Sequence, residues 1–140
     1  MNIQRIQHVA DNIRKRVLTH VISQNGGYMS QACSSAETFS ALYLHIMSMP
    51  ELDTPLKPGL FQGVPSADNM SYKTGAEYNG GHVEGFDRFY LSPAHYALVV
   101  YALLIETGRM TADGLDYFNR DGYSVEMIGA EHSPGMEVTA

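Results

Sequence analysis

The sequence contains few of the residues on which disulfide-bonded or nucleic-acid-binding proteins depend. Its 140 residues include one cysteine, Cys33, and no tryptophan. A single cysteine excludes a disulfide within the chain and fits a reducing compartment. Lys and Arg number 9 against 15 Asp and Glu, which gives a formal charge of −6. Such an acidic chain lacks the basic face that a nucleic-acid-binding surface needs, so we expect no nucleic-acid partner.

Long apolar runs are also missing. The longest, Ala97–Ile105, is far too short to span a bilayer. The first ten residues are amphipathic and carry no apolar run of the kind found in signal peptides. With 44% hydrophobic and 17% charged residues, the composition is that of an ordinary globular protein. We therefore expect one cytoplasmic domain that does not bind a membrane.

Several sequence motifs that mark catalytic or metal sites do not occur. The histidines His8, His20, His45 and His82 are scattered, with no HxxxH or CxxC pattern, so no metal site is expected within the chain. The chain has no Gly-x-Ser-x-Gly elbow for a nucleophilic serine. It also lacks the Gly-x-Gly-x-x-Gly and Walker patterns that cradle phosphates.

Apolar residues at helical spacing predict two helices in the first third of the chain. One stripe runs from Ile3 to Val21, and Asn25-Gly26-Gly27 should end that helix. The segment Ser34-Ser35-Ala36-Glu37 has the form of a capping box, which predicts that the second helix starts near Ser34. Pro50 should close this second helix.

The rest of the chain predicts an irregular segment, a strand and a buried helix. Residues 50–87 show no sustained periodicity, although their aromatic content argues against a plain flexible linker. Phe89–Leu91 is expected to be a buried strand. Ser92 should cap a helix over Pro93–Thr107 that ends at Gly108 and is buried on all sides from Ala97 onward.

Two places could carry chemistry. A helix that starts at Ser92-Pro93 offers unpaired N–H groups to an anion, and His95 lies in its first turn. A lone histidine near a helix start is also common as a packed or capping residue, so both interpretations stay open at this point. Glu131 and His132 could act as an acid–base pair or be two exposed loop residues.

The order of these segments resembles the start of a transketolase, most closely the N-terminal subunit of split transketolases. The resemblance covers nearly the whole chain except residues 50–87. Three segments carry it: Ser-Ala-Glu-Thr-Phe-Ser-Ala-Leu-Tyr-Leu-His at 35–45, Asp-Arg-Phe-Tyr-Leu-Ser-Pro-Ala-His at 87–95, and Ser-Pro-Gly-Met-Glu-Val-Thr-Ala at 133–140.

The resemblance implies an α/β fold class. Residues 1–140 would form the N-terminal, mostly helical part of a thiamine-diphosphate-binding domain, with at least one parallel core strand at Phe89–Leu91 and an irregular insert at about 50–87. It also implies an enzyme of carbohydrate metabolism that transfers a two-carbon ketol unit from a ketose, or ketose phosphate, to an aldose. The implied cofactor is thiamine diphosphate with Mg²⁺.

The resemblance also assigns site residues. His95 matches the family histidine beside the cofactor diphosphate and the reaction centre, which implies a catalytic and cofactor-binding role, with Ser92 nearby. Many transketolases have Gly-His-Pro-Gly-Gly where this chain has Gly27-Tyr28-Met29-Ser30-Gln31. Tyr28 and Gln31 are therefore candidate substrate contacts. His132 could replace a second family histidine, as a catalytic and substrate-binding residue.

Some parts of the family pattern lie beyond Ala140. The resemblance places the Mg²⁺ ligands in sequence that follows this chain, and the glutamate that activates the cofactor in a separate pyrimidine-binding domain. The implied partners are that domain or a C-terminal transketolase subunit, in a homo- or hetero-oligomer. By itself the chain should be inactive. Two alternatives remain: a non-catalytic interaction module derived from this fold, or another thiamine-diphosphate enzyme of the superfamily.

Overall fold

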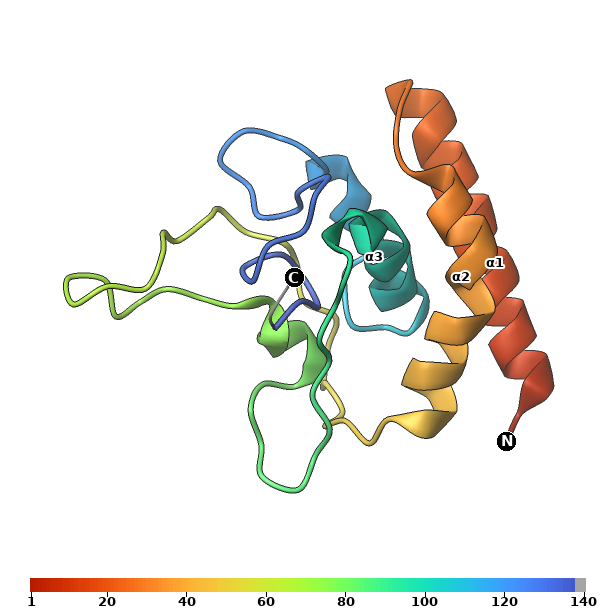
Figure 1. Cartoon of the computed structure of the whole chain (residues 1–140), viewed down its shortest axis with the longest axis horizontal. Coiled ribbons are helices and arrows are strands. Elements are labelled where there is room, and N and C mark those ends of the chain that lie inside the picture. The colour runs from red at the N-terminus through yellow and green to blue at the C-terminus, as the bar shows by residue number, and fades with distance from the viewer. Residues whose placement is uncertain (138–140) are drawn as a thin grey trace.

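The computed structural model describes residues 1–137 and is organised around three α-helices (Figure 1). These are α1 (Ile3–Gln24), α2 (Met29–Ala41) and α3 (Ala97–Glu106). Figure 1 shows α1 and α2 side by side in opposite directions, and α3 contacts both of them. The last three residues of the third resemblance segment, Val138 to Ala140, lie outside the described residues.

The first helix confirms the expectation from the apolar stripe. The Asn2 side chain accepts a hydrogen bond from the Arg5 amide at 3.0 Å and so caps the start of α1. The buried face of α1 consists of Ile6, Val9, Ala10, Ile13, Val17 and His20. The helix ends at Asn25, which takes the left-handed conformation with φ 53°.

The predicted start of the second helix is wrong. Helix α2 begins at Met29, and its N-cap residue, Tyr28, makes no side-chain capping bond. Ser34 cannot be a cap because it lies inside the helix, where its hydroxyl donates to the Gln31 carbonyl at 3.3 Å. The Glu37 carboxylate is bound by Arg14 of α1 rather than by a capping box. The chain then continues through the π-helical turn η1 (Leu42–Ile46), so the helical run does end before Pro50.

The buried helix is confirmed, but its predicted start is wrong. Every residue from Ala97 to Ile105 is buried, and Gly108 follows the helix with φ 75°. A short 3-10 turn, η3 (Ala94–Tyr96), precedes α3, and Pro93 is the N-cap residue of that turn. Ser92 is exposed and is not the cap. Within residues 1–137 no helix is both long and apolar enough to cross a membrane.

The strand predicted at Phe89–Leu91 does not form. Phe89 and Tyr90 have no regular structure, and Leu91 forms only a single-residue bridge. Residues 1–137 as a whole contain no multi-residue strand. A strand needs the backbone groups of a neighbouring strand. Here the Phe89 amide donates instead to the buried carboxylate of Glu137. Phe89 and Leu91 are nevertheless buried, as the apolar pattern predicted.

Residues 50–87 are irregular, as expected, but they are tied to the helical part. They contain the short 3-10 helix η2 (Gly75–Asn79) and bridges at single residues. Arg109, just after α3, donates to the carbonyl of Pro50 at 3.1 Å and to that of Tyr78 at 3.2 Å. A further 3-10 turn, η4 (Gly114–Tyr117), follows α3. This long segment is therefore a packed part of the fold.

Candidate functional site

Two of the predicted site residues, Tyr28 and His95, lie against each other in the structure. Their ring centroids are 5.8 Å apart and the ring planes are inclined by 59°. Tyr28 is the residue immediately before α2, and His95 is in the middle of η3. Both side chains are half-buried, so each keeps a surface that a ligand could reach.

A glycine allows this approach between segments that are far apart in sequence. Gly27 has φ 130°, and a Cβ atom there would lie 3.0 Å from Val21 and 3.1 Å from Leu98. This backbone conformation is one that other residues rarely adopt, and a Cβ atom here would crowd the ends of the Val21 and Leu98 side chains. Glycine therefore suits this turn, and its neighbour Tyr28 lies beside His95.

The start of α3 offers backbone donors beside His95. The Tyr96 amide donates to the Pro93 carbonyl at 3.2 Å, and the Ala97 amide donates to the Ala94 carbonyl. The amides of Ala94 and His95 are therefore the first N–H groups of the helical segment, where helical partners are missing. No side-chain cap covers either η3 or α3. Together with the His95 ring, these amides suit an anionic oxygen.

Two further residues predicted to contact a ligand, Gln31 and Ser92, form a less clear group with Tyr28 and His95. Gln31 lies in the first turn of α2 and is half-buried, and its side-chain oxygen accepts a hydrogen bond from the Ser30 hydroxyl at 2.8 Å. Ser92 is exposed and lies immediately before the peptide bond to Pro93. Its predicted role therefore rests on its closeness in sequence to His95, without a capping bond to support it.

His132 lies in a different environment from His95. Its ring packs on Phe61 of the 50–87 segment, with centroids 4.3 Å apart, whereas His95 packs on Tyr28 and Tyr96. The His132 Nε2 atom is buried and 3.1 Å from a carboxylate oxygen of Glu126, but the two are not aligned for a hydrogen bond. The carboxylate beside His132 is therefore Glu126 and not the predicted Glu131.

Sequence reasoning missed a buried carboxylate, Glu137, that joins two of the resemblance segments. Its side chain is 1% exposed. It accepts hydrogen bonds from Arg88 Nε at 3.1 Å and from the Phe89 amide at 2.5 Å, and His82 Nε2 lies 3.1 Å away. Arg88 and Glu137 both belong to segments that carry the family resemblance. Their distance in sequence, however, does not indicate that they are in contact.

A second buried polar residue, Asn79, connects η2 to the same region. Its side chain accepts from the Tyr43 hydroxyl at 2.8 Å and donates to the Gly135 carbonyl at 2.9 Å. Burial raises the pKa of Tyr43, so its hydroxyl stays protonated and remains a donor at neutral pH. Asn79 therefore links the segment 133–137 to Tyr43 of η1, and Glu137 links it to residues 88–89.

The structure offers no metal centre in the part of the chain that it describes. Within residues 1–137, no group of three or more His, Cys, Asp or Glu side chains is arranged to hold a metal ion. The single cysteine, Cys33, is exposed. The site around His95 is therefore built from an imidazole, a phenol and backbone amides, which bind anions or hydroxyl groups.

Comparison with known proteins gives one informative match. No protein-family model matches the chain. The chain is 31% identical over 131 residues to a protein of Sinorhizobium fredii that is named an uncharacterized transketolase family protein. The match covers 93% of this chain but 37% of that relative, so the chain spans little more than a third of its length. The chain is thus similar to a transketolase-family protein along nearly all of its own sequence.

Proposed function

We propose that this chain is the N-terminal part of a thiamine-diphosphate-dependent transketolase. The observation that carries the proposal is the 31% identity over 93% of the chain to a protein named for that family. Two structural findings support it. His95 lies at an uncapped helix start beside Tyr28, and the segments 87–95 and 133–137 meet at Glu137.

The residues around His95 fit one side of a diphosphate site. The amides of Ala94 and His95 and the imidazole are donors of the kind that phosphate oxygens accept. Residues 1–137 supply no cluster of metal ligands, so the Mg²⁺ that accompanies the diphosphate would be held by other sequence. When bound, thiamine diphosphate supplies the electron sink for breaking a bond next to a ketose carbonyl.

In this proposal each site residue of the chain has a defined task. His95 donates a hydrogen bond to an anionic oxygen and limits where the sugar donor can lie. Tyr28 packs on the His95 ring and offers its hydroxyl to a sugar hydroxyl. Gln31 and His132 are further candidate contacts to sugar hydroxyls, and Ser92 lies at the cofactor side. The transfer of a two-carbon ketol unit between sugars is the proposed reaction.

The proposal includes a partner. A pyrimidine-binding domain or a C-terminal subunit would complete the site, because the chain spans 37% of its relative. Several large apolar side chains are exposed on residues 60–90 and could meet such a partner: Leu60, Val64, Met70, Val83, Phe86 and Tyr90. The partner would make the assembly a homo- or hetero-oligomer.

Isothermal titration calorimetry with thiamine diphosphate and Mg²⁺ tests the proposal. The natural protein that contains this chain should bind the cofactor and then transfer a two-carbon unit from a ketose to an aldose. The 140-residue chain alone should not bind it. If the natural protein binds no thiamine diphosphate, the proposal is wrong and the chain is a non-catalytic interaction module. Binding without ketol transfer would identify another thiamine-diphosphate enzyme.

A further inference from the structure

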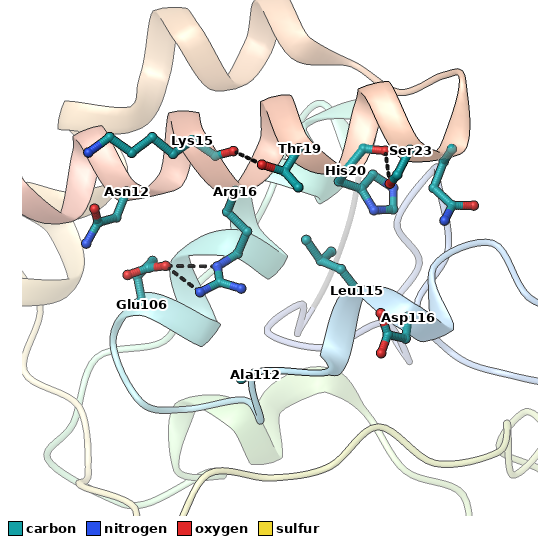
Figure 2. A pocket seen from close by; sticks show the side chains of 11 residues that line it. Asn12, Lys15, Arg16, Thr19, His20, Ser23, Glu106, Ala112, Leu115 and Asp116 are labelled. Atoms are coloured by element: carbon teal, nitrogen blue, oxygen red, sulfur yellow. Dashed lines mark hydrogen bonds and ion pairs between the residues drawn. The ribbon is translucent and has the colours of Figure 1, made fainter.

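A surface pocket, called the cavity below, lies away from the residues discussed so far. Its volume is about 560 Å³, and Figure 2 shows it between the middle of α1, the end of α3 and η4. None of His95, Tyr28 and His132 lines it. Its walls are mostly polar or charged and include Lys15, Arg16, His20, Glu106 and Asp116.

His20 is the most informative residue of this cavity. It is 6% exposed, yet its Nε2 atom makes no hydrogen bond within residues 1–137. Figure 2 shows the ring on the side of α1 that faces the cavity. The His20 ring packs against the Phe118 ring in a T-shaped arrangement, with ring centroids 4.6 Å apart. A buried polar atom without a partner is rare in folded proteins and indicates a position where a ligand or water completes the bond.

The charges around the cavity nearly cancel. Arg16 is bound to Glu106, with Nε and Nη2 both 2.8 Å from the same carboxylate oxygen. A guanidinium has five N–H donors and Glu106 is bound through Nε and Nη2, so this ion pair does not use the N–H groups of Nη1. Lys15 extends along α1 away from His20 in Figure 2. Asp116 is the remaining charge beside His20 and can only accept hydrogen bonds.

We propose that this cavity binds a small neutral polyhydroxyl compound, of the sugar or sugar-alcohol class. A hydroxyl group donates and accepts, so it can pair with the His20 Nε2 atom in either neutral tautomer. The same molecule can donate to Asp116 and accept from Arg16 Nη1. Burial lowers the pKa of His20, which keeps the ring neutral at pH 7 and favours a neutral partner over an anion.

Other ligand classes fit the cavity less well. A phosphate bound at His20 would need an unpaired cation there, but Glu106 neutralises Arg16 and the Lys15 side chain extends away from His20. An apolar ligand would leave the polar walls without partners. A metal ion would need three ligands, and no such group occurs in residues 1–137. The proposed site shares none of the residues assigned to the diphosphate side, so it is independent of the proposed transketolase function.

NMR titration of the 140-residue chain tests the proposal. Xylitol and D-glucose are the probes, and the ¹⁵N signals of the His20 ring and the amide signals of residues 16, 115 and 116 are followed. We expect saturable shifts in these signals with either probe, and none with inorganic phosphate at equal ionic strength. If neither xylitol nor glucose gives saturable shifts, or if phosphate alone does, the proposal is wrong.

Two variants localise the binding. His20→Phe removes the Nε2 atom and keeps an aromatic ring against Phe118, and it should weaken binding at least tenfold. Asp116→Asn leaves the side chain's size unchanged, and it should weaken binding several-fold even if the His20 variant folds poorly. The matched control is His45→Phe, because His45 is exposed and does not line the cavity. Unchanged binding in a folded His20→Phe or in Asp116→Asn would contradict the assignment.

Discussion

The helical part of this molecule and its loop-rich part are held together in different ways. Helix α3 is buried on all sides from Ala97 to Ile105, and α1 and α2 pack with it in one apolar core. Residues of the segments 50–96 and 107–137, such as Phe89, Met110 and Met136, also join this core. Single polar side chains such as Asn79, Glu137 and Arg109 hold these segments in addition. The helices therefore depend on apolar packing, whereas the loop-rich part combines apolar packing with a few polar side chains that bind backbone groups.

The largest expected effect is on the helical part. Leu103→Ala removes a side chain that is 0% exposed in the middle of α3. It should lower the free energy of unfolding by about 2–5 kcal/mol, because it leaves a cavity in the core. Urea denaturation followed by circular dichroism measures this. The control Leu18→Ala, at a 42% exposed position of α1, should change it little. A loss near zero for Leu103→Ala would contradict a core centred on α3.

The loop-rich part should respond locally. Glu137→Gln weakens the hydrogen bonds from Arg88 and from the Phe89 amide. The free energy of unfolding should fall by about 1–3 kcal/mol, because the buried Phe89 amide loses a charged acceptor. Hydrogen exchange should show lost protection at Phe89, while α1 and α2 keep theirs. The control Glu84→Gln changes an exposed carboxylate and should leave the exchange pattern unchanged. If protection from exchange fell equally over the whole chain, the helical part and the loop-rich part would unfold together, which would contradict this prediction.

The same contrast explains which features could be predicted from the sequence. The apolar stripe of α1 and the apolar run of α3 are local patterns, and both helices were predicted with their ends at Asn25 and Gly108. The start of α2 was missed because no side-chain cap marks it. The turn before this start contains Gly27, where a side chain would crowd Leu98, a residue far away in sequence.

The candidate site shows the same division between local and distant information. His95 was proposed from its place at a predicted helix start and from the family resemblance, and Tyr28 from the resemblance alone. Their contact became visible only in the fold. The Phe89–Leu91 strand failed because a strand depends on a neighbour, which sequence periodicity does not report. Glu137 was missed because its partners lie 48 and 49 positions earlier in the chain.

A smaller effect should appear in the pH dependence of stability. Burial lowers the pKa of His20 from its usual 6.5, so the unfolded chain binds the proton first as the pH falls. The free energy of unfolding should therefore decrease below pH 6.5, by at most about 1.4 kcal/mol per pH unit. Urea denaturation at several pH values measures this. If His20→Phe shows the same decrease, His20 is not its cause.

The smallest expected effect concerns the surface contact between α1 and α2. A hydrogen bond from Arg14 lowers the pKa of Glu37 from 4.5 to about 2. Its stabilisation should be present above pH 4.5 and lost as the pH falls towards 2. Both side chains are partly exposed, so Glu37→Gln should cost only about 0.2–1 kcal/mol at pH 7. The control Asp11→Asn, whose carboxylate lies 3.7 Å from Arg14, should cost less in thermal denaturation.

Cofactor affinity of a His95 variant tests the central claim most directly. In the natural protein that contains this chain, calorimetry with thiamine diphosphate and Mg²⁺ should show affinity at least tenfold weaker for His95→Ala than for wild type. His45→Ala, at an exposed histidine in η1, should bind like wild type. Unchanged affinity in a folded His95→Ala protein would contradict the assignment of His95 to the diphosphate side.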